Sequence, residues 1–226
     1  MLGVAVNFFA VVLGGMVGTA LRGGIPERYR ALIQQGLALC VTVIGIAGAI
    51  ATKNMLLVIV STVIGAIIGT RIGIEAGVER LGAWAQDRFR KGGFAEGFVN
   101  ATLLFSIGSM AVVGSLNAGF GDSDTLIAKA AIDGVSAVII ASTYGIGAAF
   151  AAVPMTAYQG AIALLAGVVR PYMTEDMIGE MGAIGSLIII ALGLNMLGLT
   201  RIKVANLLPA MFIPCVYYPL ASIIRF

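Results

Sequence analysis

Long apolar runs follow one another along almost the whole sequence, and the charged residues lie in the short stretches between them. A helix needs about 20 apolar residues to cross the hydrocarbon core of a bilayer. Only 11% of the residues are charged, whereas soluble domains average about 25%, so too few charges are available to cover a surface in water. We therefore expect an all-α fold, a polytopic bundle of transmembrane helices, built as a single transmembrane domain over residues 1–226.

Eight runs are long enough, or nearly long enough, to be spans. The first is interpreted as a span and not as a cleaved signal peptide, because no positive charge precedes its apolar core. Little more than Pro154 separates the fifth run from the sixth, so the two could form a tight helical hairpin, or one of them could be broken or re-entrant. The predicted spans are Leu2–Leu21, Ala31–Ala51, Met55–Thr70, Phe94–Leu116, Ala130–Val153, Met155–Val169, Gly182–Leu199 and Val204–Ile224.

Basic residues indicate which way the chain crosses the membrane. Most of the fourteen Lys and Arg residues fall in the first, third and seventh loops, which share one side of an eight-span topology. Basic loops tend to stay in the cytoplasm, so both termini are predicted to lie outside. The outer loops Gly121–Asp124 and Thr174–Glu180 are acidic. In the third loop, residues 75–91 place apolar side chains at near-helical spacing, which predicts a short amphipathic helix at the cytoplasmic interface.

Histidine is absent, and the two cysteines, Cys40 and Cys215, lie in apolar runs. A zinc site of the usual His and Cys type is therefore excluded, and neither a metal nor a cofactor is expected. The spans hold no close pair of acids and no recognisable nucleophile motif, so we do not expect an enzyme. The basic residues lie in loops, as membrane topology alone produces, so nucleic acid is not an expected partner. The expected partners are the lipid bilayer and a small solute or ion.

Polar side chains inside a bilayer are costly, so those in the spans are the first candidates for a binding site. Asn100 and Thr102 lie in the fourth span. Asp133 follows Lys129 by one helical turn near the predicted outer end of the fifth span, where the two share a face and could pair. The pair could be a partly solvated ion pair at the membrane surface, or Asp133 could bind a cation or proton at an outer vestibule.

Glycine and proline residues mark places where the predicted helices could break. Two glycines flank Ile146 and predict an unwound point there. Asn195 lies between two glycines, and Asn206 precedes Pro209. Such breaks are tolerated in membranes only inside protein or beside water, although ordinary hydrogen bonding between helices is an alternative role for the amides. The predicted solute- or ion-binding residues are Asn100, Thr102, Asp133, Gln159, Asn195 and Asn206.

A weak internal repeat joins the two ends of the sequence. The stretch Leu37–Lys53 resembles Gly185–Arg201 at a spacing of 148 residues, and Gly45 then falls on Gly193. Spans 1–3 would correspond to spans 6–8, and the odd number of spans between the copies would invert the second one, as in many transporters. Glycine-rich faces in the first and third spans could serve internal packing or a homodimer interface. They contain Gly14, Gly15, Gly18, Gly65, Gly69 and Gly73.

Several motifs resemble the signature of a bacterial membrane family of unknown function, typified by YqgA and YdfK. They are Gly97–Gly119, Gly121-Asp122, Lys129 with Asp133-Gly134, Tyr158-Gln159-Gly160, Gly193-Leu194-Asn195 and Val204–Ala210. The resemblance covers nearly the whole chain and implies a multi-pass protein of the bacterial cytoplasmic (inner) membrane. It implies no substrate and no established site residues.

Taken together, the amides, the single carboxylate within a span and the helix breaks favour a small-solute or ion transporter or channel. The preferred cargo is a monovalent cation or a solute coupled to one, because amide, hydroxyl and carbonyl oxygens suit a cation. The alternative is a structural, assembly or sensory membrane protein, in which packing explains every polar residue.

Overall fold

A computed structural model describes residues 1–23, 26–77, 80, 93–107, 109–169 and 173–224. Most of the interfacial helix predicted at residues 75–91 lies outside the described residues. The described helices are α1 Leu2–Arg22, α2 Glu27–Ala49, α3 Met55–Ile72, α5 Phe94–Ser106, α6 Ser109–Gly119, α7 Asp124–Tyr144, α8 Gly147–Phe150, α9 Ala152–Leu164, α10 Ala166–Val169, α11 Glu175–Met196, the 3-10 helix η2 Val204–Phe212, and α12 Pro214–Ile224.

Within the described part of the chain, seven helical segments are long and apolar enough to cross a membrane. The pair α5 and α6, bent by 65° at a short break, makes an eighth. The predicted all-α transmembrane bundle of about eight helices is therefore confirmed. Short breaks divide three of these segments, the α5–α6, α8–α9 and η2–α12 pairs.

The first and fifth spans run parallel. Gly3 near the start of α1 lies against Leu126 near the start of α7, and Gly18 near the end of α1 lies against Ala141 near the end of α7. Their backbones approach closely because glycine carries no side chain at these contacts. Parallel packing of the first and fifth spans requires an odd number of spans between them, as the eight-span topology has.

The sixth span runs back against α1. Gly15 in α1 lies against Ala149 in α8, whereas Asn7, two turns earlier, bonds Gln159 further along the chain in α9. Since α1 is parallel to α7 and antiparallel to α8 and α9, the fifth and sixth spans form a hairpin. The structure thereby selects the hairpin from the alternatives that the sequence left open.

The turn of this hairpin is not at Pro154, so the predicted spans Ala130–Val153 and Met155–Val169 are wrong at their boundaries. The fifth span starts at Asp124 and ends at Tyr144, because Gly145 turns the chain with a φ of 91°, a conformation that favours glycine. Pro154 lies in the first turn of α9, where the missing N–H leaves no helical bond unmade.

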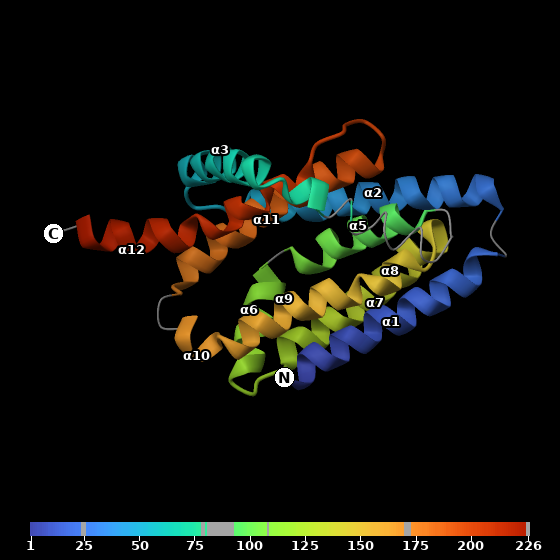
Figure 1. The fold of residues 1–226 in the computed structure, drawn as a ribbon, viewed down its shortest axis with the longest axis horizontal. Helices are drawn as coiled ribbons and strands as arrows, with labels where there is room; N and C mark the ends of the chain where they lie inside the picture. The colour runs from blue at the N-terminus through green and yellow to red at the C-terminus, as the bar shows by residue number, and fades with distance from the viewer. Residues whose placement is uncertain (24–25, 78–79, 81–92, 108, 170–172, 225–226) are drawn as a thin grey trace.

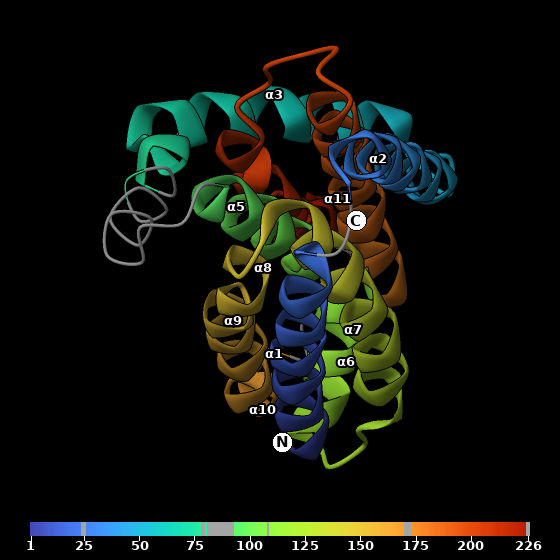
Figure 2. The same cartoon turned by 90° about the vertical axis from the view of Figure 1, so that its right-hand side faces the viewer.

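The helices form two groups, seen in Figures 1 and 2. In one group α1 packs against α7, α8 and α9, and α6 packs against α7 and α9. In the other, α2 packs against α11 and α3 packs against η2. Each group combines a segment from the first three spans with its proposed counterpart from the last three.

Contacts between α2 and α11 support the internal repeat. Gly45 of α2 packs against Ile190 of α11, and Gly193 of α11 packs against Thr42 of α2. The spacing of 148 residues that places Gly45 on Gly193 also places Thr42 on Ile190. The two contacts therefore exchange when the two halves are exchanged, as a two-fold relation between the copies produces.

A second contact lies where we expect the two-fold axis that relates the two copies of the repeat. Upstream of the stretch aligned at 148, Asn7–Gly15 loosely match Gln159–Gly167. The Asn7 amide in α1 lies 3.2 Å from Gln159 Oε1 in α9, its counterpart in that match. A residue can contact its own counterpart only close to a two-fold axis. The inverted repeat predicted from spans 1–3 and 6–8 gains support from both contacts.

The glycine-rich faces of the first and third spans are used inside the chain. Gly14 and Gly18 pack on α7, and Gly65 and Gly69 pack on Ala210 and Asn206 of η2. Gly15 packs on Ala149 of α8, and Gly73 ends α3 in the left-handed conformation. Internal packing is therefore the role that the structure gives to these faces.

Candidate functional site

A buried polar cluster joins the first, fifth and sixth spans. The Asn7 amide nitrogen in α1 donates to Asp133 Oδ2 at 3.0 Å and lies 3.2 Å from Gln159 Oε1. The Lys129 ammonium, one turn before Asp133 on α7, forms an ion pair with the same carboxylate oxygen. Two residues predicted from the sequence, Asp133 and Gln159, are thus brought together by Asn7, which the sequence analysis did not select.

All four side chains are shielded. Asn7 and Gln159 are fully buried, and Lys129 and Asp133 are 6% and 5% exposed. The ion pair is therefore not the partly solvated surface pair that one interpretation of the sequence proposed. Asn7 Oδ1 and Gln159 Nε2 lack a hydrogen-bond partner among the described residues. Buried polar atoms are nearly always paired, so the two amides have unused hydrogen-bonding capacity beside the ion pair.

The ion pair faces a cavity of about 740 Å³. Helices α2, α7 and α11 form its walls together with the ends of α5 and α6. Apart from Lys129 and Asp133, its described polar side chains include only Ser136 and Ser186, and most of the remaining wall is aliphatic. Ligand sites commonly have this size and combine apolar walls with a few polar groups.

The cavity lies between the two groups of helices and half-way along its spans. Asp133 is at the middle of α7, and Cys40 and Ser186 are near the middle of α2 and α11. The sequence analysis placed Asp133 near the outer end of its span, and this prediction is wrong. The span begins six residues before the predicted Ala130. Substrate sites of many transporters lie at the same depth, between repeats.

The break between α5 and α6 also meets the cavity. The helix leaves its regular path at Ile107, whose backbone is extended with φ −93° and ψ 139°, and Ile107 and Met110 both line the cavity. Interrupted helices leave backbone groups without helical partners, and in membranes such groups are found inside protein or beside water. The break is thus placed where it could contact a solute.

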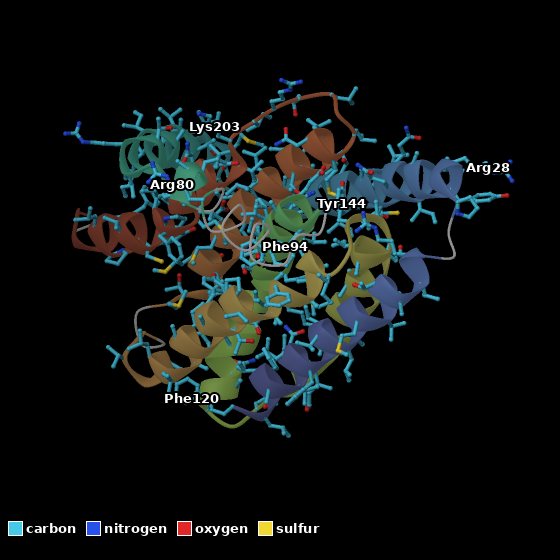
Figure 3. The ribbon with its side chains drawn as sticks, turned by 45° about the vertical axis from the view of Figure 1, so that its right-hand side comes forward. Arg28, Arg80, Phe94, Phe120, Tyr144 and Lys203 are labelled. Carbon is cyan, nitrogen blue, oxygen red and sulfur yellow. The ribbon has the colours of Figure 1, made fainter. Side chains whose placement is uncertain are left out.

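The predicted residues Asn100 and Thr102 lie elsewhere on α5. Asn100 neighbours the Tyr144 side chain, together with Glu96, and the Thr102 hydroxyl is buried without a hydrogen-bond partner among the described residues. Figure 3 shows Phe120, which precedes α7, at the lower edge of the molecule and Tyr144, which ends α7, near its middle. Neither Asn100 nor Thr102 lines the cavity.

The predicted residues Asn195 and Asn206 form hydrogen bonds that hold loop segments in place. Asn195 Oδ1 accepts hydrogen bonds from Thr200 Oγ1 at 2.7 Å and from the Ile202 amide at 2.9 Å, which fixes the turn after α11. Asn206 Oδ1 accepts from the Glu75 amide at 2.9 Å, and the Glu75 carboxylate accepts in return from the amide of Ala205 at 2.7 Å. These hydrogen bonds give both asparagine side chains a structural role that requires no ligand.

Glu180 is a second buried acid, which the sequence analysis placed in an outer loop. The segment Thr174–Glu180 is instead the start of α11, because the Thr174 hydroxyl accepts from the Met177 amide and caps the helix. Glu180 is 2% exposed, and its carboxylate accepts from Thr52 Oγ1 at 2.5 Å and from two backbone amides of the α2–α3 loop. Glu180 therefore holds this loop.

An exposed ion pair, Lys53 with Asp176, lies next to the Glu180 contacts. Lys53, outside the spans, bonds the Asp176 carboxylate at 2.7 Å, and this bond raises the pKa of the lysine above its ordinary value. Both side chains are largely exposed, and exposed ion pairs contribute little to stability.

Glu180→Leu is expected to lower the free energy of unfolding by about 3 kcal/mol, because it leaves several buried donors unpaired. The measurement is thermal unfolding of the purified protein in detergent. Asp176→Asn, one turn earlier on the same helix, is the matched control and should change the melting temperature little. Equal effects of the two changes would show that the Glu180 contacts do not stabilise the loop.

Among the described residues, no group of three or more Cys, Asp or Glu side chains is placed to hold a metal ion. The geometry instead combines one ion pair, two amides and an apolar cavity. Residues 2–219 match the family model described as "Protein of unknown function (DUF554)". The chain belongs to this family.

Two relatives in the DUF554 family cover nearly the same length. The chain is 33% identical over 219 residues to the "Uncharacterized membrane protein YdfK" of Bacillus subtilis, with 95% of this chain and 94% of the relative aligned. It is 31% identical over 220 residues to the "Uncharacterized protein YqgA" of Escherichia coli, with 94% of each aligned. No solved structure matches. The family membership and the apolar helices agree that this DUF554 member is a multi-pass membrane protein.

Proposed function

We propose that this protein transports a small solute or ion across the bacterial inner membrane, with its termini outside, and that it catalyses no chemical reaction. The observation that carries the proposal is the ion pair of Lys129 and Asp133, which is buried half-way through a span and faces a cavity between two groups of helices. Buried ionisable groups at this depth are costly and usually serve a transport path.

The arrangement of the helices supports a transport mechanism. The reciprocal contacts of Gly45 and Gly193 support an inverted repeat, and in such proteins one group of helices rocks against the other around a site near the membrane centre. The cavity is lined by α7 from one group and by α2 and α11 from the other. Rocking of the groups would open this cavity to each side in turn.

Asp133 is the group that exchanges partners in this mechanism. Its Oδ2 atom accepts from both Lys129 and Asn7, so a cation that binds the carboxylate must compete with the lysine ammonium. The proposed cargo is a monovalent cation, or a solute whose movement is coupled to one, because the carboxylate can exchange the lysine ammonium for another cationic group. Release of Lys129 from Asp133 would then accompany each binding event.

The test is a flux measurement with purified protein in liposomes. The panel should contain indicators for H⁺, Na⁺ and K⁺ and labelled organic solutes, with protein-free liposomes as the blank. At least one species should cross faster with protein than without it. No flux across the panel, together with no ligand-dependent rise in melting temperature, would remove the transport proposal and favour a structural, assembly or sensory role.

A further inference from the structure

We infer that the cargo is an apolar-bodied zwitterion, a solute that carries an ammonium and a carboxylate on a hydrophobic body. Hydrophobic amino acids and short apolar peptides with free termini have this chemistry. The inference rests on the proposed transport function and names the substrate class for the same cavity. Its basis is the charge, the wall composition and the volume of that cavity.

The charges favour a solute with both signs. Lys129 and Asp133 both line the cavity, and they neutralise each other. A solute with one charge would pair with one of them and leave the other unpaired in an apolar environment, which is strongly unfavourable. A zwitterion can pair its ammonium with Asp133 and its carboxylate with Lys129, so no charge is left alone. The cation that the site accepts is then the ammonium of the solute itself.

Hydrogen-bonding capacity is available for this exchange. An ammonium has three donors and a carboxylate has two acceptor oxygens. Within the described part of the chain, hydrogen bonds to the Asp133 carboxylate reach its Oδ2 atom, with Lys129 and Asn7 as the donors. Lys129 therefore has further donors, and Asp133 has its Oδ1 atom, to bind a solute while the pair separates.

The walls favour an apolar body. The lining includes Leu37, Val41 and Ile44 from α2 and Ile132 and Ile139 from α7. Removing apolar surface from water contributes about 25 cal/mol per Å². A bare inorganic ion would leave most of the 740 Å³ unfilled and would contact little of this surface. An aliphatic body occupies more of this volume than an ion does and buries part of that apolar surface.

Two residues on α2 make the cavity testable. Gly36 lines it, and a Cβ atom added at Gly36 would meet nothing within 4 Å, so a larger side chain can enter the cavity without displacing protein. Cys40, one turn further along, lines it too, and its side chain is exposed. The other cysteine, Cys215, is only partly buried and can be replaced by serine to leave one thiol.

The experiment measures the rate at which N-ethylmaleimide modifies Cys40 in the Cys215→Ser protein. The probes are leucyl-leucine, its N-acetyl derivative, which is an anion, and its amide, which is a cation. At a concentration about ten times its Kd, a ligand that covers Cys40 should slow the reaction about tenfold. Leucyl-leucine should protect Cys40, and the two singly charged analogues should protect it much less.

Variants test whether the protection of Cys40 requires ligand binding in this cavity. Gly36→Leu should abolish protection by leucyl-leucine, whereas Gly160→Leu, another open helical glycine outside the cavity, should leave it unchanged. The double change Lys129→Met with Asp133→Asn should remove the preference for the zwitterion. The melting temperature of each variant shows that it is folded.

The outcomes separate this inference from the transport proposal. Protection by the anion or the cation equal to that by leucyl-leucine overturns the zwitterion, and so does an absence of protection by all three. Flux of an inorganic ion without Cys40 protection would retain the transporter and discard this substrate class. Protection without uptake of labelled leucyl-leucine would retain the binding site and discard transport.

Discussion

Asp133→Asn alone is expected to lower the free energy of unfolding by about 3–5 kcal/mol, because it leaves the buried Lys129 ammonium without its partner. The side chains of both residues are 7% exposed, so water replaces little of the lost interaction. For a chain of this length, this loss corresponds to a fall of about 10 °C in melting temperature. Lys129→Met alone should have an effect of similar size through the unpaired carboxylate.

The double variant, Lys129→Met with Asp133→Asn, should recover most of this stability, because it removes both buried charges together. Flux should not recover, since the proposed mechanism needs the pair to separate and form again. Val135→Ala, at an exposed position on the same helix that does not line the cavity, is the control and should change both measurements little. Additive losses in the double variant would contradict an interacting buried pair, and normal flux in it would remove the pair from the transport mechanism.

The spans were largely predictable because each needs a long apolar run, and such runs can be recognised one at a time. The boundary between the fifth and sixth spans could not be predicted in the same way. Pro154 suggested a break there, but it lies in the first turn of α9. The unwound point predicted around Ile146 is where the chain turns. The positive φ of Gly145 ends α7 there, so the glycines were the more informative signal.

The candidate site was predicted only in part. Asp133 and Gln159 were selected as costly polar groups, but their contact depends on Asn7, which is more than 100 positions away from both. A sequence does not state which faces of distant helices meet. The signal that was available is that Asn7 is the one amide in the first predicted span.

Glu180 was missed for a different reason. Acidic residues between apolar runs are typical of loops, so the segment from Thr174 was interpreted as one. The capping residue Thr174 followed by Glu175 and Asp176 in a first turn is a helix start, and acids are favourable there. This local pattern predicts the helix, although the contact of Glu180 with the α2–α3 loop requires the tertiary structure.

Gly45→Val and Gly193→Val are each expected to destabilise the protein strongly, and by similar amounts. A Cβ at Gly45 would lie 2.7 Å from the Ile190 backbone nitrogen, and one at Gly193 would lie 3.0 Å from the Thr42 backbone nitrogen. Real Cβ contacts with backbone are longer, so α2 and α11 must separate. Since small residues allow this close packing, each change should prevent folding or cost about 3 kcal/mol or more, as overpacking does.

Gly36→Val is the matched control, because Gly36 lies on the same helix as Gly45 and has open space around it. It should leave the melting temperature close to that of the parent protein, since valine is at least as favourable as glycine within a helix. The comparison also tests the internal repeat. If the two copies are related by a two-fold axis, the Gly45 and Gly193 contacts are equivalent, and their variants should lose similar stability. A large loss at one position with a small loss at the other would show that α2 and α11 do not pack as symmetric counterparts.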